Sequence, residues 1–415
     1  MMKYRLAVPG PTPLPPEVVA AATIPMEDER THSYAAIFTR VVDNLKRTLL
    51  TDNDLLLFAS SMTGAFEGAV QNLCSPGDRV LVVNNGAFGQ RWVELATTFG
   101  LDVVEVAEQW GRPVDMRRVA EAVAATPDLV AAIAVHCETS TATVNDMRGF
   151  GEATRTIVSV VDTASGVGAC ELRTDDWGLD VVVAGCQKAL MTPPGLAFAS
   201  ISPRAWLLHE RATLPRYYFD WDRTRDALRA DIARTPWTPA VSLINQLDVA
   251  LRRLHDEGIE HVFARHVRLG RMVRAGVLGM GLDLLSADDD RNAAVTAVTL
   301  PPGLDARALV DHLLDEYGVQ IVDSGGPLAA RVVRIGHCGY VDILDAVAIL
   351  SAFGLALRDL GCAVDVGGGV AAALAVAAAP RDDDRRAPVR TDQLRLSPRD
   401  RADRADAYEL VRGHR

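Results

Sequence analysis

The chain has 415 residues and is 49% hydrophobic, so it is long enough for two domains and can bury a substantial core. Its formal net charge of −11, with no basic stripe, argues against a nucleic-acid partner. No apolar run is long enough to span a membrane and the N-terminal residues lack the apolar core of a signal peptide, so we expect a cytoplasmic protein.

Short apolar runs alternate with helical patterns between about residues 54 and 202. The predicted strands cover residues 55–58, 80–83, 103–106, 130–135, 157–161, 181–184 and 196–201. Helices are predicted over residues 63–73 and from about 90 to 99. Nearly continuous apolar runs separated by helices indicate an α/β fold, with a mainly parallel sheet covered on both faces. In such sheets ligands bind beyond the C-terminal ends of the strands.

The pattern changes after about residue 250, where long helical stretches lead into weaker strands. We predict a smaller, C-terminal α+β domain there. The expected parts of the chain are an N-terminal arm (1–20), a large domain (21–250), a small domain (251–379) and a tail (380–415). The tail is rich in Arg and Asp and poor in apolar residues, so burial cannot offset its ordering entropy and we predict that it is disordered.

Small and hydroxyl-bearing residues follow the first predicted strand, in Ser60-Ser-Met-Thr-Gly-Ala65 at the start of a helix. Free N–H groups and the helix dipole can hold a phosphate there, although an ordinary Ser/Thr N-cap is the alternative. After the second strand, Phe88 stands between two glycines in a predicted turn. Its face could stack on a planar group, and a hydrophobic staple is the alternative interpretation.

Polar residues also follow two later strands. A polar cluster extends from His136 to Asn145, for which an ordinary polar loop is the alternative. Asp162 comes directly after the apolar run 157–161. A carboxylate is costly to bury there without a cationic partner, and an exposed helix cap is the alternative.

Only three lysines, Lys3, Lys46 and Lys188, stand among the 43 basic residues. Lys188 follows the strand at 181–184, and unlike arginine a lysine can become neutral and form a Schiff base. A surface lysine at a strand end is the alternative. A reactive amine, an acid that keeps a ring nitrogen protonated and a phosphate cradle are the parts that pyridoxal phosphate requires. Because all three follow strand ends here, together they predict this cofactor.

The motifs resemble those of the class V aminotransferases of fold type I, in the alanine–glyoxylate and serine–pyruvate group, over roughly residues 4–379. The segments that carry the resemblance are Pro9-Gly-Pro-Thr12, Ser61-Met-Thr-Gly-Ala-Phe-Glu67, Asn85-Gly-Ala-Phe-Gly-Gln-Arg91, Glu138-Thr-Ser-Thr141, Asp162, Gly185-Cys-Gln-Lys188, Thr235-Pro-Trp-Thr-Pro239 and Arg334-Ile-Gly-His-Cys-Gly-Tyr340. The resemblance implies the fold type I architecture, in which a large domain with a mainly parallel sheet precedes a smaller α+β domain. Met62 and Ala142 stand where relatives usually have glycine, which affects the expected substrate more than the expected cofactor.

The resemblance also implies roles for individual residues. The residues implied to hold pyridoxal 5'-phosphate are Ser61, Met62, Thr63, Gly64, Phe88, Thr139, Asp162, Gln187, Lys188, Thr235 and Thr238. Lys188 would be the Schiff-base lysine and Asp162 the partner of the pyridine nitrogen. Thr235 and Thr238 would reach the phosphate of a neighbouring subunit, which implies a homodimer with shared active sites. Arg334, as a bidentate fork, and Gly10 are the expected substrate-binding residues.

We therefore expect a ping-pong transamination from a small amino acid, such as alanine or serine, to a 2-oxo acid such as glyoxylate or pyruvate. The freed amine of Lys188 would act as the general base. Alternatives are another class V enzyme, namely a lyase or a cysteine desulfurase, and a non-catalytic scaffold. A nicotinamide dehydrogenase is disfavoured because no Gly-x-Gly-x-x-Gly follows the first strand.

The cysteines bear on the desulfurase alternative. All six are scattered without Cys-x-x-Cys spacing, which predicts reduced thiols and neither a disulfide framework nor a zinc site. A desulfurase needs a cysteine on a mobile loop ahead of the substrate arginine. The loop at 323–330 has none, and Cys338 follows Arg334 in a Gly-flanked segment, so we interpret Cys338 as structural.

Overall fold

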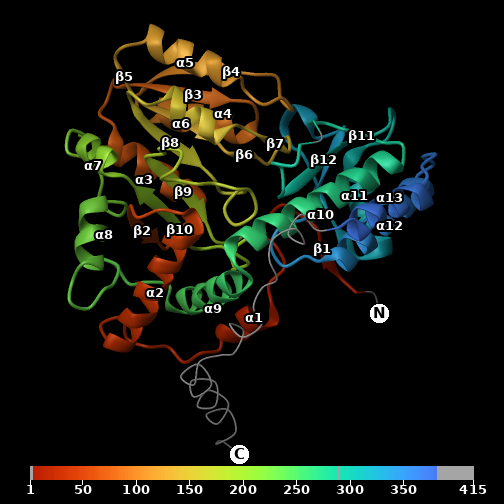
Figure 1. Ribbon diagram of the computed structural model, residues 1–415, viewed down its shortest axis with the longest axis horizontal. Coiled ribbons are helices and arrows are strands. Elements are labelled where there is room, and N and C mark those ends of the chain that lie inside the picture. Colours follow the sequence, from red (N-terminus) through yellow and green to blue (C-terminus); the bar gives the residue numbers. More distant parts are fainter. Residues whose placement is uncertain (1–2, 288, 381–415) are drawn as a thin grey trace, which may run out of the picture. The chain divides into compact units, whose positions relative to one another are not determined.

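The computed structural model describes residues 3–287 and 289–380, so residues 381–415 of the predicted tail lie outside the described residues (Figure 1). The predicted α/β fold is confirmed by a seven-stranded sheet with the order β2-β10-β9-β8-β5-β3-β4. Its strands are β2 (Asp54–Phe58), β3 (Arg79–Asn84), β4 (Asp102–Ala107), β5 (Leu129–Val135), β8 (Val158–Asp162), β9 (Val181–Gly185) and β10 (Ala197–Ile201). Strand β10 runs antiparallel to both of its neighbours, β2 and β9, and the remaining pairs are parallel, so the other six strands end at the same edge.

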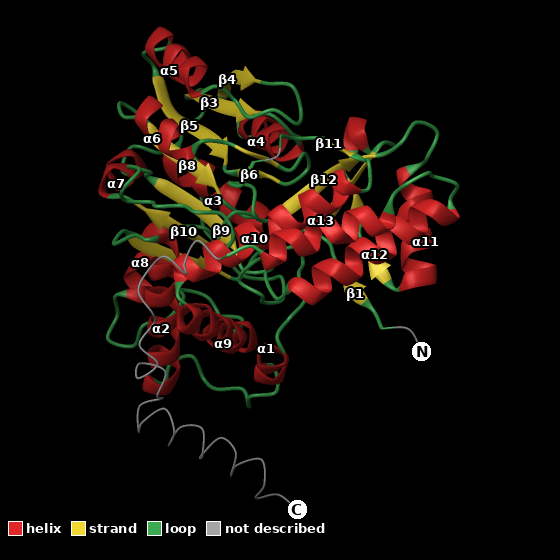
Figure 2. Cartoon of the chain, turned by 45° about the vertical axis from the view of Figure 1, so that its right-hand side comes forward, coloured by secondary structure: helices red, strands yellow, loops and turns green. Residues whose placement is uncertain are grey.

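Both faces of this sheet are buried, as the continuous apolar runs predicted. In β2, Leu55 and Leu57 belong to the core on one face, whereas Leu56 and Phe58 belong to the core on the other. The first face is covered by α2 (His32–Leu49), α5 (Met116–Ala125), α6 (Met147–Ala153) and α9 (Val241–Glu257), and the second by α3 (Met62–Leu73), α4 (Ala87–Thr98), α7 (Pro203–His209) and α8 (Trp221–Leu228). Figure 2 shows these helices around the strands of the sheet.

The predicted start of the second helix was wrong. Helix α4 begins at Ala87 and not near residue 90, so Phe88 lies in its first turn and not in a loop. The physical reason is a cap that comes from elsewhere in the chain: the backbone N–H groups of Phe88 and Gly89 each donate to the carboxylate of Glu138 at 3.0 Å. A carboxylate at this end also complements the helix dipole.

A second, four-stranded antiparallel sheet follows in the sequence, in the order β11-β12-β15-β14. Its strands are β11 (Asp283–Leu284), β12 (Val295–Thr299), β14 (Val322–Asp323) and β15 (Val332–Gly336), and the helices that share its core are α10 (Ile259–Gly279), α11 (Ala306–Tyr317), α12 (Ile343–Asp359) and α13 (Val366–Ala378). Near the N-terminus, β1 (Arg5–Leu6) pairs in parallel with β13 (Val319–Gln320). Helix α9 crosses residue 250, where the boundary between the two domains was predicted. The position of that boundary stays a prediction.

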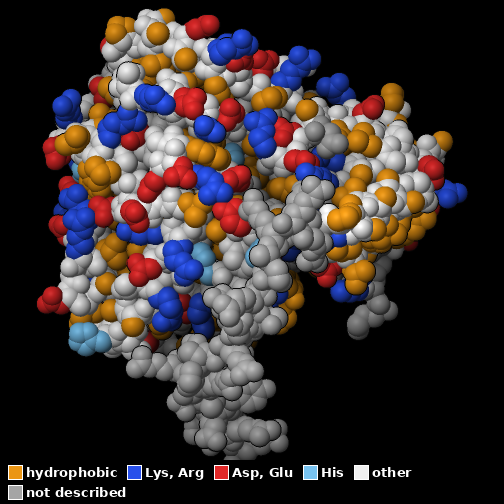
Figure 3. All heavy atoms as spheres, in the orientation of Figure 1, with side chains coloured by type: hydrophobic (Ala, Val, Ile, Leu, Met, Phe, Trp, Pro, Cys, Tyr) orange, Lys and Arg blue, Asp and Glu red, His pale blue; other side chains and the backbone are white. Residues whose placement is uncertain are grey.

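The surface carries charges of both signs. On the face shown in Figure 3, Lys and Arg side chains are interspersed with Asp and Glu. Among the described residues, no helix combines the length and the apolar character that crossing a bilayer requires.

Candidate active site

The predicted lysine lies at the edge where the parallel strands end. Lys188 follows β9 and is half-buried, and its Nζ donates a hydrogen bond to Ser165 Oγ at 2.6 Å. The Nζ atom also lies 5.7 Å from the centroid of the Phe88 ring. Burial lowers the pKa of the Lys188 amine, and the positive charge of Arg334 lowers it further, whereas Asp162 acts in the opposite direction. This environment favours a neutral amine, which is the form that can act as a nucleophile or base.

The N-terminal segment packs directly against this lysine. A Cβ atom on Gly10 would lie 3.0 Å from both Cγ and Cε of Lys188, and Gly10 has a φ of +142°. Two residues on, the Thr12 hydroxyl donates to the carbonyl of Lys188 at 2.6 Å, and the Thr12 N–H donates to the carbonyl of Gln187 at 3.1 Å. Gly10 is therefore close to the lysine, and a side chain at position 10 would meet both a disfavoured φ and the Lys188 side chain. Its predicted role in substrate binding stays a prediction.

Asp162 is the last residue of β8, one strand away from the lysine, and only 2% of it is exposed. Its carboxylate accepts from the backbone N–H of Ala164 at 2.9 Å and from Nε1 of Trp92 at 3.3 Å. Burial raises the pKa of Asp162 to about 6, against these two hydrogen bonds and the charge of Lys188, which lower it. A buried carboxylate held by neutral donors is suited to a further cationic N–H partner, such as a protonated ring nitrogen.

The predicted phosphate cradle would lie at the N-terminus of α3 (Met62–Leu73). Ser61 is its N-cap residue, and the Ser61 side chain makes no capping hydrogen bond. Ser61 is exposed and Thr63 is half-buried, so the first turn is open. Gly185 lets Gln187 reach this turn, because a Cβ on Gly185 would lie 2.6 Å from Met62 Sδ and 2.7 Å from Gln187 Oε1. The residues predicted to hold the phosphate therefore come from the segments that follow two strands, β2 and β9.

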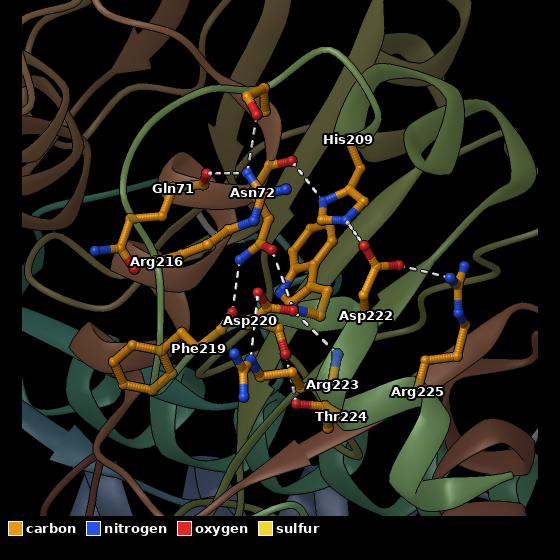
Figure 4. Close-up of polar contacts among 12 residues, drawn as sticks. Gln71, Asn72, His209, Arg216, Phe219, Asp220, Asp222, Arg223, Thr224 and Arg225 are labelled. Atoms are coloured by element: carbon orange, nitrogen blue, oxygen red, sulfur yellow. Dashed lines mark hydrogen bonds and ion pairs between the residues drawn. The ribbon is translucent and has the colours of Figure 1, made fainter.

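Helix α3 packs against the segment that precedes α8. Gly64, Gly68 and Asn72 line one face of the helix, and a Cβ on Gly64 would lie 2.6 Å from Phe219 Cζ. Figure 4 shows Asn72 beside Phe219: its Nδ2 donates to the carbonyls of Phe219 at 2.6 Å and Gly68 at 2.7 Å. Its Oδ1 accepts from the N–H of Trp221 at 3.1 Å. Asn72 thereby fixes α3 against a segment almost 150 residues away in sequence.

The carbonyl of Asn72 also accepts from Nδ1 of His209 at 3.0 Å, and Nε2 of His209 faces the carboxylate of Asp222 at 3.0 Å. In Figure 4 the His209 ring lies between these two partners. Helices α3, α7 and α8 are thus joined through one buried side chain.

The polar cluster after β5 is buried and not an ordinary surface loop. It contains a short hairpin of β6 (Cys137–Glu138) and β7 (Thr143–Val144). Glu138 is fully buried, and besides capping α4 it accepts from the N–H of Ser140 at 3.1 Å. Burial raises the pKa of Glu138, against these hydrogen bonds, which lower it. The carboxylate therefore connects the predicted ring-stacking residue, Phe88, to the loop of Thr139.

Arg334 on β15 extends from the second sheet to this loop. Its Nε and Nη2 donate to the carbonyl of Asp323 at 3.0 and 2.7 Å, and its Nη1 donates to the carbonyl of Thr139 at 3.3 Å. An arginine has five N–H donors, so after these three bonds one N–H on each terminal nitrogen is left for a ligand. N–H groups on the two terminal nitrogens of a guanidinium can bind a carboxylate as a fork.

Thr235 and Thr238 lie in the segment before α9, beside the residues that end β2. Thr235 Oγ1 donates to the carbonyl of Trp237 at 2.6 Å, and Trp237 Nε1 donates to the carbonyl of Tyr218 at 3.0 Å. Thr238 is exposed. Among the described residues, no hydrogen bond joins either threonine to Lys188 or to Asp162.

Three residues at the site were not assigned roles from the sequence: Trp92, Glu138 and Ser165. Glu138 and Ser165 belong to the polar segments that follow buried strands, and a polar segment at that place in the sequence could have indicated both as site residues. Trp92 lies within α4 with no such signal, because its contact with Asp162 joins positions 70 residues apart.

The donor set fits pyridoxal phosphate. A half-buried amine, a buried carboxylate without a cationic hydrogen-bond partner among the described residues and an open helix N-terminus lie at one sheet edge. These match the aldehyde, the ring nitrogen and the phosphate of the cofactor.

Cys338 is 1% exposed, and burial raises the pKa of its thiol to about 12. A thiolate is the reactive form of cysteine, so this environment opposes a nucleophilic role.

Residues 6–338 match a family model described as Aminotransferase class-V. A soluble hydrogenase 42 kDa subunit from Anabaena cylindrica is 36% identical over 380 residues, which cover 90% of this chain and 98% of the relative. An L-aspartate–glyoxylate aminotransferase from Paracoccus denitrificans is 36% identical over 376 residues, covering 88% and 94% of the two chains. The solved structure of pyridoxamine–pyruvate aminotransferase from Mesorhizobium loti is similar with a TM-score of 0.87 at 29% identity, covering 91% of this chain and 97% of the other.

Proposed function

The chain belongs to the class-V aminotransferases, and from that membership we propose that it moves the amino group of a small amino acid, alanine- or serine-like, to glyoxylate or pyruvate. The enzyme is a pyridoxal-phosphate-dependent aminotransferase. The observation that carries the assignment of its site is the convergence of the Lys188 amine, the buried Asp162 carboxylate and the N-terminus of α3 at one sheet edge. Relatives that act on glyoxylate and pyruvate support the choice of acceptor.

Each predicted site residue would have its own role in the reaction. Pyridoxal phosphate, when bound, supplies an aldehyde carbon for the amino group and a ring that withdraws electrons from the substrate Cα. Asp162 would keep a proton on the ring nitrogen, and Phe88 would provide an aromatic face for the ring. The N–H groups at the start of α3, with Gln187, hold the phosphate. Lys188 Nζ would take the proton from the substrate Cα and deliver it to the cofactor carbon that binds the amino group, which its lowered pKa permits.

Arg334 would set the orientation of the substrate. Its two remaining N–H groups grip the carboxylate of either the amino acid or the 2-oxo acid, so that one site serves both halves of the reaction. The guanidinium is already held by the carbonyls of Asp323 and Thr139, which lowers the entropy lost on binding.

We further propose a homodimer with shared active sites, in which Thr235 and Thr238 contact the cofactor phosphate of the neighbouring subunit. The exposure of Thr238 and of the nearby Tyr217 and Tyr218, which are 64% and 42% exposed, supports this proposal. The cytoplasmic location expected from the sequence stays a prediction.

The test is a half-reaction screen. Purified protein loaded with pyridoxal phosphate is mixed with single amino acids, and the visible absorbance of the bound cofactor is followed. A productive donor should bleach the absorbance, and glyoxylate or pyruvate should restore it. Protein that never acquires the absorbance, or never bleaches with any amino acid, would support the scaffold alternative. Release of sulfide from cysteine would support the desulfurase instead.

Two variants separate the roles within that screen. Lys188→Ala should abolish turnover, and near-normal exchange would remove the lysine assignment. Arg334→Ala should raise the apparent KM for the amino acid by about a hundredfold because a bidentate charge-assisted contact is lost. Arg331→Ala, an exposed arginine on the same segment, is the matched control and should leave KM unchanged.

A further inference from the structure

The amine of Lys188 is the start of a chain of hydrogen bonds that none of the roles above uses. Its Nζ donates to Ser165 Oγ at 2.6 Å. Ser165 Oγ and Thr139 Oγ1 are hydrogen-bonded to each other, and Thr139 Oγ1 lies 3.4 Å from the carbonyl of Cys137. Ser165 and Thr139 are only 3% and 2% exposed. The chain therefore leads from the reacting nitrogen into the protein, away from water.

The chemistry of these groups gives the chain a direction. A backbone carbonyl only accepts, so the Thr139 hydroxyl donates to Cys137 and is left to accept from Ser165. The Ser165 hydroxyl thus donates to Thr139 and presents its lone pairs to the lysine. Each bond in such a chain polarises the next, which makes Ser165 Oγ a better acceptor than an isolated hydroxyl.

We propose that Ser165, oriented by Thr139, is a catalytic residue. It accepts a hydrogen bond from the protonated Lys188 amine and so stabilises the lysine while the lysine carries the transferred proton. The proposal rests on the proposed function, because it concerns the lysine during amino-group transfer. When the substrate amine takes the place of Lys188, the lysine must remain within reach of Cα. A hydrogen bond from Nζ to Ser165 fixes the nitrogen and restricts the swing of its flexible four-carbon stem.

The hydrogen bond also affects the basicity of the amine. Accepting from the charged ammonium is worth more than accepting from the neutral amine, so Ser165 favours the protonated lysine. Burial acts in the opposite direction and lowers the pKa of Lys188. The Lys188 amine would then be basic enough to take the proton from Cα, while a sufficient fraction of the amine stays neutral and able to accept it.

The sequence makes a direct test possible because the chain has only three lysines. The full-length protein, with its cofactor removed, is labelled with lysine carrying ¹³C at Cε, and the three signals are followed by NMR as the pH is changed. The signal that disappears in Lys188→Arg identifies the active-site amine. Lys3 and Lys46 serve as internal controls, because neither takes part in the chain.

In Ser165→Ala the titration of the Lys188 signal should shift down by about 1 pH unit, which is the effect expected for loss of one acceptor to a charged donor. Thr139→Val should shift it in the same direction by a smaller amount, and Ser165→Thr, which keeps the hydroxyl, should leave it near the wild-type value. In the half-reaction, Ser165→Ala should lower the rate of proton transfer by about tenfold with little change in KM, because the substrate carboxylate site is intact.

Two results would overturn the proposal: an unchanged Lys188 titration in both Ser165→Ala and Thr139→Val, or an unchanged half-reaction rate in Ser165→Ala. If Ser165→Ala does not fold, the Thr139→Val titration decides alone. The NMR measurement does not require turnover. A wild-type protein that fails to transfer amino groups would therefore refute the proposed function, while the titration still reports whether Ser165 holds the amine.

Discussion

Asp162 illustrates how a site residue can oppose the stability of the fold. Its pKa is raised by burial to about 6, whereas a carboxyl in an unfolded chain has a pKa of about 3.9. The folded state therefore binds this proton more tightly. The carboxylate has no effect on stability below both values, and it destabilises the fold as the pH rises through about 6.

We predict the consequence for Asp162→Asn in the protein without cofactor. Relative to wild type, the free energy of unfolding of the variant should rise by about 2 kcal/mol between pH 4 and pH 8. Loss of the bond from Trp92 adds an offset that does not depend on pH. Urea unfolding at several pH values measures the difference, and a difference that stays constant with pH would show that the carboxyl is not perturbed.

Gly10 is the residue at which the N-terminal segment limits the space around the lysine. In Gly10→Ala, the new Cβ would lie 3.0 Å from Cγ and Cε of Lys188, at a φ of +142° that side chains disfavour. We predict that kcat falls about tenfold to a hundredfold because the amine is displaced.

Gly77→Ala is the matched control, since Gly77 also has a positive φ of +84° but a Cβ there meets nothing within 4 Å. It should lose some stability while keeping kcat. Equal losses of kcat in the two variants would mean that backbone strain, and not contact with the lysine, is the cause.

At the scale of elements, we predict that the proposed phosphate cradle depends on how α3 is anchored at its other end. Asn72 is fully buried and makes three hydrogen bonds that join α3 to the segment before α8. We predict that Asn72→Ala lowers the free energy of unfolding by about 2 kcal/mol, because buried backbone groups lose their partners.

The same variant should weaken the binding of pyridoxal phosphate, since the first turn of α3 is no longer held in place. Cofactor titration of the protein monitored by absorbance measures this loss. Gln71→Ala on the same helix is the control: the contact of Arg216 there is to the Gln71 backbone carbonyl, which the substitution keeps. Unchanged cofactor affinity in Asn72→Ala would show that the cradle does not depend on this anchor.

At the scale of the whole molecule, three buried histidines make the fold sensitive to acid. Burial lowers the pKa of His136 to about 4 and those of His266 and His337 to about 3, with nearby arginines acting in the same direction. Nε2 of His266 accepts from the N–H of Gly339 at 2.9 Å, and a proton on that nitrogen would break the bond.

The unfolded chain binds these protons near pH 6.5, so stability should be lost as the pH falls from about 6.5 towards 4. We predict a decrease of several kcal/mol over that range, measured as the urea midpoint at pH 7 and at pH 4.5. His266→Gln should reduce the dependence on pH, and His261→Gln, at an exposed position, should not. A midpoint that is the same at both pH values would contradict the prediction.

The elements themselves could largely be predicted from the sequence. Each strand of the large sheet was expected within a few residues, because most of these strands are buried on both faces and give continuous apolar runs. The edge strand β4, by contrast, is partly exposed. The start of α4 was the exception, since its N-terminal N–H groups are capped by Glu138, which lies about 50 residues away in sequence. A cap of that kind leaves no pattern near the helix.

By itself the sequence determined the class of fold and the chemistry of the site: alternating apolar runs specify a covered parallel sheet, and a single lysine and a single aspartate after neighbouring strands indicate the cofactor. These features are formed by residues that are close together in the sequence, so the sequence alone reveals them. Only the tertiary structure decided which side chains contact the lysine, the aspartate and the helix that follow these strands. Trp92 on Asp162, Ser165 and Gly10 on Lys188, and Asn72 behind α3 all act across the fold, where neighbours in space are far apart in sequence.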